Sequence, residues 1–294
     1  MSLTSAMFTG VSGLLANGDA MNVIGNNISN VNTVGYKESR SLFSDLLSAN
    51  TGNNSQVGKG VQMQAVQNVF TQGSSQSSEN ISDLSIQGNS FFALKAPTAA
   101  SPIATQDAAV LSRAGAFKVD NNNTLVNPDG YQVLDTTGAP ITFLNTGSAP
   151  TTDFSKITKI DTNGLITYLA TDGVTQNYYN TSGAAGLAVN AGNAATVQRV
   201  AVVTAADPSA LTKVGGSLYQ TNGNSGVAAT AFTLAGNQPN GTSEQVLSNS
   251  LEQSNVDMAS EFVKMIVTQR AYSANSKTIT TTDQMTQEVL GLIR

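Results

Sequence analysis

The chain has 294 residues, 11% of them charged, and a formal net charge of -5 at pH 7. Its length allows one large domain or two to three smaller ones, and its acidic balance argues against the basic surface that nucleic-acid binding requires. It contains no cysteine and no histidine, which excludes disulfides, zinc–thiolate sites and histidine-based catalysis. No run of eighteen apolar residues occurs in the sequence, so we expect no membrane insertion.

The N-terminal sequence does not resemble a secretion signal. A Sec signal has a basic start, an apolar core and a small-residue cleavage site, whereas the first basic residue here is Lys37. If the protein leaves the cell, we therefore expect export without a cleaved signal peptide.

An apolar stripe at the N-terminal end predicts a long helix. Its members recur at alternating three- and four-residue steps, which place them on one side of a helix, as in a coiled coil. They are Leu3, Met7, Gly10, Leu14, Asn17, Met21, Ile24, Ile28 and Val31. Each glycine in the segment costs about 1 kcal/mol relative to alanine, so we expect the helix to fold only on assembly. A helix docked on its own domain is the alternative.

A second stripe predicts a helix at the C-terminal end. It consists of Met258, Phe262, Met265, Tyr272, Ile279, Leu290 and Ile293. We expect this helix to begin near Ser254 and Asn255, because Ser254 and Asp257 have capping-box spacing, and to continue close to Arg294. Glu252, Asp257 and Glu261 are expected to form a solvated face at the positive end of its dipole.

The middle of the chain predicts mainly antiparallel sheet. Alternating or short apolar segments at 61–65, 84–86, 90–95, 116–119, 131–134, 157–160, 165–168 and 197–203 are strand candidates. Turn sequences at 127–130, 163–164 and 172–173 separate several of them, and the segments 177–195 and 221–241 are expected to be loops or linkers. The predicted fold class is α+β. Residues 1–35 with 250–294 form a helical coiled-coil assembly domain, 36–70 a connecting hairpin or tongue, and 71–249 a β-rich domain.

The sequence offers no constellation for catalysis. Without histidine or cysteine no Ser-His-Asp or Cys-His site is possible, and no GxGxxG or Walker loop supports nucleotide binding. Asp120 and Asp129 flank asparagine-rich turns but lack the ligand order of an EF-hand, so we interpret them as turn residues. We predict no enzyme activity, no cofactor and no metal.

Three regions resemble the bacterial flagellar axial proteins of rod and hook. The signature-like segment 26–37 contains Asn26, Asn27, Asn30, Thr33, Gly35, Tyr36 and Lys37. The segments 251–258 and 269–272 match near the C-terminal end, and 84–92, 112–117 and 125–131 match in the middle. The matches follow the family's order along the chain.

This resemblance implies a polymer subunit. Terminal helices of many copies would pack as concentric coiled coils around a secretion channel, with the β domain outside, and Phe43 would join the two stripes at the assembly interface. The compact segment 39–60 is similar to hook proteins, and only about sixty residues lie between Asp135 and Val197. The expectation is therefore a short hook protein without the large outer domain, forming an extracellular, flexible tube that transmits torque from motor to filament.

The resemblance also leaves alternatives and implies partners. A distal-rod or other hook-basal-body protein of the periplasmic basal body is the first alternative, and a self-associating β-rich surface protein is the second. The implied partners are further copies of this chain in a helical homopolymer, the distal rod, hook cap and hook–filament junction proteins, and the flagellar export apparatus.

Overall fold

A computed structural model describes residues 3–46, 49–52, 55–99, 101–188, 197–242 and 244–292. The chain divides into two compact units. The first, here called the helical unit, comprises Met1–Val31, Glu38–Val69 and Val256–Arg294; the second, the β unit, comprises Asn32–Lys37 and Phe70–Asn255. The predicted α+β class is confirmed, with helices at both ends of a chain whose middle is mostly antiparallel sheet.

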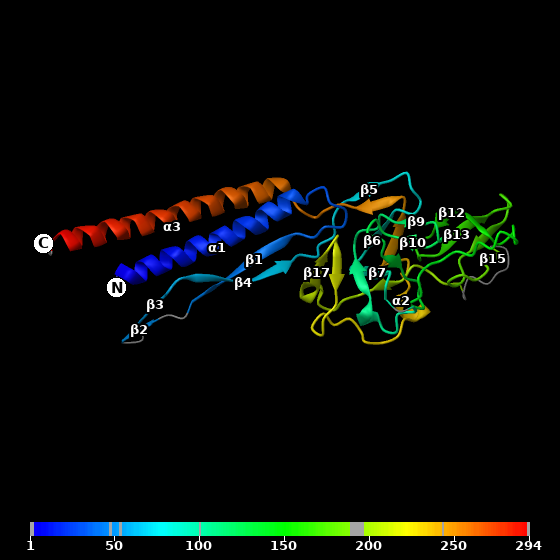
Figure 1. The fold of residues 1–294 in the computed structure, drawn as a ribbon, viewed down its shortest axis with the longest axis horizontal. Helices are drawn as coiled ribbons and strands as arrows, with labels where there is room; N and C mark the ends of the chain where they lie inside the picture. Colours follow the sequence, from blue (N-terminus) through cyan, green and yellow to red (C-terminus); the bar gives the residue numbers. More distant parts are fainter. Residues whose placement is uncertain are drawn as a thin grey trace. The chain divides into compact units, whose positions relative to one another are not determined.

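Two long helices dominate the helical unit. Helix α1 spans Leu3–Ser29 and α3 spans Met258–Leu292, which corresponds to about 40 and 52 Å at 1.5 Å per residue. They lie side by side and antiparallel (Figure 1), so that Gly10 faces Ile279 while Asn27 contacts Glu261. The ends of the chain therefore pack on each other, as the two stripes predicted.

Small residues on α1 make this close packing possible. The buried face of α1 consists of Gly10, Gly13, Ala16, Ala20, Ile24 and Asn27. A Cβ at Gly10 would lie 2.8 Å from Cγ1 of Ile279, so a larger residue would push the helices apart. The helix cost of this glycine is thus offset by close contact. In this structure α1 packs on its own chain, as the alternative of a docked helix predicted. Whether α1 is unfolded before assembly stays a prediction.

Helix α3 begins later than the sequence predicted. Asp257 caps it, because its Oδ1 accepts a hydrogen bond from the Ala259 amide at 3.0 Å. The predicted start at 254–255 was wrong because the chain just before it is held in a sheet: β20 (Ser250–Glu252) pairs with β5 (Ser75–Ser77), and the Gln253 amide donates to the Ser74 carbonyl at 2.8 Å.

A long β-hairpin completes the helical unit. Strands β1 (Ser39–Asp45) and β4 (Val61–Asn68) pair antiparallel, with an irregularity between Leu42 and Phe43. Strands β2 (Ala49–Gly52) and β3 (Ser55–Val57) pair with each other. Both β1 and β4 contact α1, so the hairpin forms a second layer against the N-terminal helix.

The β unit contains two larger sheets and two strand pairs. The first sheet has the order β17 (Thr212–Gly215), β18 (Leu218–Gln220), β8 (Val110–Ser112), β7 (Phe91–Lys95), β11 (Gln132–Val133), β10 (Leu125–Val126) and β9 (Lys118–Val119), with β16 (Val202–Val203) also paired to β7. The second has the order β12 (Phe154–Ile160), β13 (Ile166–Ala170), β14 (Gln176–Tyr178) and β15 (Leu187–Ala188). Strand β19 (Gln245–Ser248) pairs with β6 (Leu84–Gln87). All the described pairings are antiparallel.

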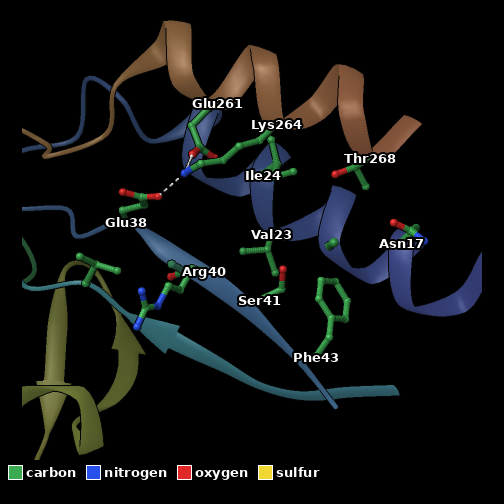
Figure 2. A pocket seen from close by; sticks show the side chains of 13 residues that line it. Asn17, Val23, Ile24, Glu38, Arg40, Ser41, Phe43, Glu261, Lys264 and Thr268 are labelled. Carbon is green, nitrogen blue, oxygen red and sulfur yellow. Dashed lines mark hydrogen bonds and ion pairs between the residues drawn. The ribbon is translucent and has the colours of Figure 1, made fainter. Parts of the chain in front are cut away.

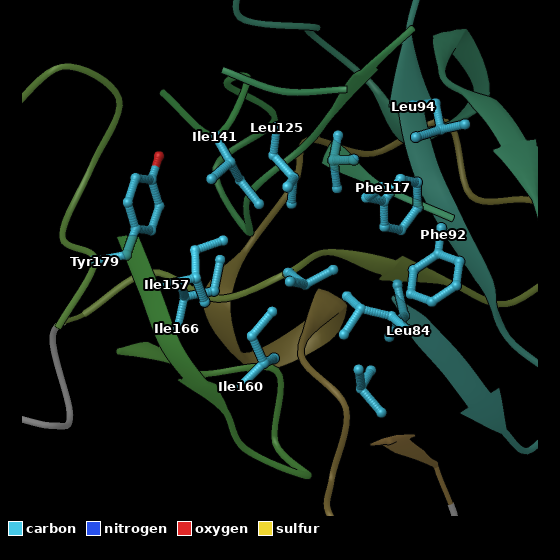
Figure 3. Packing of buried hydrophobic residues seen from close by; sticks show 14 of the residues in the cluster. Leu84, Phe92, Leu94, Phe117, Leu125, Ile141, Ile157, Ile160, Ile166 and Tyr179 are labelled. Atoms are coloured by element: carbon cyan, nitrogen blue, oxygen red, sulfur yellow. The ribbon is translucent and has the colours of Figure 1, made fainter. Parts of the chain in front are cut away.

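Strand β7 separates two apolar clusters. Successive side chains of a strand point to opposite faces, so Phe92 and Leu94 join one cluster while Phe91 and Ala93 join the other. In the first cluster the Phe92 and Phe117 rings meet edge to face, with centroids 5.1 Å apart (Figure 3). Burial on both faces explains why this strand is a continuous apolar run rather than an alternating one.

The turns agree with the sequence better than the strand lengths do. Gly130, Gly164 and Gly173 all have positive φ at the three predicted turns. The strand predicted at 197–203 is reduced to Val202–Val203, and part of 177–195 is strand rather than loop. Within 221–241 a short helix α2 spans Leu234–Asn237, whereas 189–196 lie outside the described residues. Among the described helices, none is long and apolar enough to cross a membrane.

Candidate functional site

The N-terminal stripe is divided between contact and surface. Gly10 and Ile24 are buried against the rest of the helical unit. Leu14, Asn17, Met21, Ile28 and Val31 are half-buried. Met7 is exposed, and the Leu3 side chain lies outside the described residues. Most of this stripe is therefore only partly covered within the chain.

The C-terminal stripe shows the same division. Met265 and Ile279 are half-buried, whereas Met258, Phe262, Tyr272 and Leu290 are exposed, and Ile293 lies outside the described residues. The covered face of α3 also includes the polar residues Glu261, Thr268, Asn275 and Thr282. Because polar side chains interrupt the contact, the helices pair without a continuous apolar core, and the predicted coiled coil is not confirmed.

Both helices present apolar side chains to solvent. On α1 the exposed face contains Phe8, Val11 and Leu15, here called the α1 outer face. On α3 it contains Phe262, Val263, Ile266 and Val267, here called the α3 outer face. Exposed apolar patches mark protein–protein or membrane interaction sites or ligand-binding grooves.

A partly buried polar cluster connects the three segments of the helical unit. The Asn27 side chain donates to the Ser39 carbonyl at 2.7 Å and to Glu261 Oε2 at 3.0 Å, while the Ser39 amide donates to Asn27 Oδ1 at 3.0 Å. Lys264 Nζ lies 2.7 Å from Glu38 Oε1 and 2.5 Å from Glu261 Oε1 (Figure 2). Asn27, Glu38, Ser39, Glu261 and Lys264 thus fix α1, β1 and α3 to one another.

The position of Glu261 corrects a prediction from the sequence. It is 1% exposed and pairs with Lys264, instead of belonging to a solvated face. Burial lowers the pKa of Lys264, but hydrogen bonds to Glu261 and Glu38 outweigh this effect and leave its pKa raised. The lysine accordingly stays charged between the two carboxylates.

A groove adjoins this cluster in the helical unit. Its volume is about 490 Å³. Its apolar lining comes from Ala20, Val23, Ile24, Phe43 and Val69, and its polar lining from Asn17, Glu38, Ser39, Arg40, Ser41, Glu261, Lys264 and Thr268. Figure 2 shows Glu38 and Glu261 toward one end and Phe43 and Asn17 toward the other.

A second buried cluster, here called the Lys37 cluster, lies in the β unit. Lys37 Nζ donates to Glu252 Oε1 and to the Thr71 carbonyl, both at 2.7 Å. Arg113 Nη1 lies 3.4 Å from Glu252 Oε2, and the Gly73 amide donates to Oε1 at 2.9 Å. Burial lowers the pKa of both Lys37 and Arg113, and the charge of Glu252 only partly offsets it.

The Lys37 cluster also contradicts the prediction that Glu252 lies on a solvated face at the start of the C-terminal helix. Glu252 is 1% exposed and lies in β20 rather than at the start of a helix. It holds two cations, one from the signature-like segment and one from the segment after β8. Of the three acidic residues, only Asp257 is exposed, and it caps the start of α3.

The glycine of the signature has a specific geometric role. Gly35 has φ +67°, and its amide donates to the Glu252 carbonyl at 2.8 Å. A Cβ at this position would lie 2.4 Å from the Ala114 amide nitrogen, so no side chain fits. The neighbouring Tyr36 ring lies under Lys213 Nζ, 4.5 Å from the ring centroid.

The other signature residues shape the chain that leaves α1. The Asn30 amide and side chain both donate to the Asn26 carbonyl, at 3.2 and 2.8 Å, and the Tyr36 amide donates to the Thr33 carbonyl at 3.2 Å. The sequence identified this segment but not its partners Glu252 and Arg113. Glu252 and Arg113 could have been singled out from the sequence, because both lie in segments that resemble the same family.

Three sequence families match successive parts of the chain. Residues 7–37 match the family described as flagella basal body rod protein, and residues 85–168 match the flagellar hook protein FlgE/F/G D1 domain. Residues 247–292 match the flagellar basal body rod FlgEFG protein C-terminal family. Asn27, Gly35 and Lys37 fall in the first match, and Glu252 and Glu261 in the last.

Individual relatives differ in how much of their length aligns. The chain is 34% identical to the flagellar basal-body rod protein FlgG of Bacillus subtilis strain 168, over 98% of this chain and 99% of that protein. It is 30% identical to FlgG of Borreliella burgdorferi over 95% of each chain. The flagellar hook protein FlgE of Borreliella burgdorferi is 37% identical, but over 49% of this chain and 34% of the hook protein.

These matches confirm the resemblance found in the sequence. The rod relatives cover nearly the whole chain, and the matched families occur in the order expected from the three similar regions. The chain belongs to the flagellar rod and hook axial protein family, whose members are structural proteins of the bacterial flagellum and not enzymes.

Proposed function

We propose that this chain is a subunit of the distal flagellar rod. The observation that carries the proposal is the extent of alignment: a rod protein aligns over 99% of its length, whereas the hook proteins align over about a third of theirs. The hook interpretation from the sequence is thus less well supported than its rod alternative. The compact 39–60 segment, which favoured a hook, does not outweigh a full-length match.

The surfaces of the helical unit support a polymer. Both outer faces expose large apolar side chains that a lone subunit would leave in water. Burying each of them fully would contribute roughly 1.5–3 kcal/mol. In the proposed rod, neighbouring copies cover these faces and the helices line the tube. The assembly residues predicted from the two stripes, together with Phe43, belong to this proposal.

The buried clusters support a stiff subunit. Asn27 and its partners connect three segments in the helical unit, and Glu252 connects four in the β unit. Separating Glu252 from Lys37 or Arg113 would leave a buried charge unpaired, which is strongly unfavourable. A rod needs this rigidity more than a bending hook does.

The location and partners follow from the same proposal. The subunit would be exported without a cleaved signal peptide by the flagellar export apparatus and would lie in the periplasmic part of the basal body. Its partners would be further copies of itself and the axial proteins that adjoin the distal rod.

Deletion of the gene in its own bacterium tests rod against hook. We expect isolated basal bodies to end in an incomplete rod below the outer membrane, as seen by electron microscopy. Complete rods that lack only a hook would contradict the proposal and support the hook alternative. Re-expression of the wild-type chain should restore complete rods, which excludes an effect on neighbouring genes.

A further inference from the structure

The groove in the helical unit has the chemistry of a docking site for an uncharged apolar surface. Its floor contains Ala20, Val23, Ile24 and Phe43, and its charged residues balance: Glu38 and Glu261 against Arg40 and Lys264. Lys264 already pairs with both Glu38 and Glu261, and Arg40 donates a hydrogen bond to Gln67. An occupant therefore needs apolar side chains and no charge, because a buried extra charge would find no opposite partner.

The α1 outer face meets this requirement. Phe8 is 73% exposed and Leu15 66%, and residues 3–18 contain no charged side chain. The α3 outer face fits less well, because its segment includes Glu261 and Lys264, which line the groove themselves, and the charged Arg270. Of the two outer faces, the α1 outer face is thus the better match.

The α1 outer face cannot reach the groove of its own chain. Val11 and Val23 lie on the same uninterrupted helix, and twelve residues correspond to about 18 Å along its axis. A straight helix cannot fold back over that distance, so the occupant must come from another copy.

We propose that the α1 outer face of one copy inserts Phe8, Val11 and Leu15 into the groove of a second copy. The two surfaces differ, so the contact is head-to-tail: each copy offers one outer face and one groove. Repetition of such a contact generates rings where the rotation closes and open helical assemblies where it does not, rather than closed dimers. The inference rests on the proposed self-association and names the residues that carry one of its contacts.

Substitutions at two exposed positions test the outer face and the groove separately. Leu15→Asp blocks the outer face and leaves the groove intact, whereas Phe43→Asp does the reverse. Neither variant alone should polymerise, but an equimolar mixture should form dimers, doubling the mass of the 30.3 kDa monomer in analytical ultracentrifugation. Val66→Asp is the matched control: Val66 lies on the same hairpin, is 49% exposed against 46% for Phe43, and does not line the groove. It should polymerise like the wild type.

Cross-linking provides the second measurement, since the chain has no cysteine of its own. Polymers made from mixed Leu15→Cys and Phe43→Cys chains should form a disulfide-linked pair on oxidation, and Phe262→Cys with Phe43→Cys should not. Polymers without the first cross-link, or with only the second, would overturn the inference while leaving the proposed function intact. A wild-type chain that remains monomeric at all concentrations would overturn both.

Discussion

Lys37 and Glu252 form an ion pair of 2.7 Å between side chains that are 215 positions apart in the sequence and both inaccessible to solvent. Each carries a charge that the protein interior disfavours, and the lowered pKa of Lys37 shows that burial exceeds the attraction of its partner. Such a buried pair adds little net stability relative to apolar residues, whereas the loss of one partner is strongly destabilising.

Removing one partner should be costly. Glu252→Ala leaves Lys37 and Arg113 buried without their carboxylate, so we expect a loss of about 3–5 kcal/mol in the free energy of unfolding. Urea unfolding followed by circular dichroism measures it. The matched control is Asp161→Ala, which breaks the exposed pair with Lys159 and should cost less than about 1 kcal/mol. Equal effects of the two substitutions would contradict the role of the buried cluster.

Gly35→Ala should destabilise the β unit through two effects. A positive φ costs a non-glycine residue about 1–2 kcal/mol, and the new Cβ would overlap the Ala114 backbone. Gly173→Ala separates the effect of positive φ from the effect of steric overlap. Gly173 has φ +74°, but a Cβ added there would have no neighbour within 4 Å. We expect the Gly35 variant to lower the melting temperature clearly more. If both lower it equally, the close approach to Ala114 is not important.

Asp135 should make stability depend on pH. Burial raises the pKa of its carboxyl above 3.8, although hydrogen bonds from Thr137, Ala139 and Tyr179 oppose this effect. A raised folded-state pKa means that the folded protein binds the proton more tightly. The contribution of Asp135 to the free energy of unfolding therefore falls as pH rises from about 4 through the folded pKa.

Asp135→Asn removes this titration. Its melting temperature minus that of the wild type should become more positive between about pH 4 and pH 7. Asp172 supplies a control of opposite sign, since hydrogen bonds from Thr175 and Val174 lower its pKa. For Asp172→Asn the same difference should become more negative as pH rises from the lowered folded pKa to about 4, and should change little above that pH. Parallel curves for the two variants would refute the assignment to Asp135.

Charges on the flank of α1 should prevent assembly without unfolding the β unit. Met21 and Ile28 are half-buried and belong to the predicted interface. Met21→Asp or Ile28→Asp would place a carboxylate in that contact, at a cost of several kcal/mol. We expect loss of polymerisation in sedimentation assays and an unchanged thermal transition of the β unit. Polymerisation that persists would remove these residues from the interface.

Limited proteolysis should distinguish the two units in the free subunit. The β unit has two apolar clusters, whereas the helices share a contact interrupted by polar residues. Segments with few buried apolar contacts open most readily. We expect a resistant core that contains the β unit, Asn32–Lys37 and Phe70–Asn255, identified by mass spectrometry, and rapid cleavage within α1 and α3. Helices that resist cleavage in a verified monomer would show that α1 does not depend on assembly.

Features that depend on local spacing could be predicted from the sequence alone. The stripes predicted both terminal helices, since a helix repeats every 3.6 residues. Glycine at positive φ marked the turns at Gly130, Gly164 and Gly173, because few other residues adopt that conformation. The segment containing Asn27 and Lys37 was recognised from residue identity alone.

The contacts of those residues depend on long-range packing, which the sequence pattern does not report. Glu252 and Glu261 have the sequence context of a solvated helix start, but Glu252 is buried with Lys37 and Arg113 and Glu261 with Asn27, and these partners come from distant parts of the chain. The start of α3 moved to Met258 because β20 pairs with β5, a contact across about 175 residues that no local pattern reports. Local propensity sets which elements form; burial and long-range pairing set where they end and which charges they enclose.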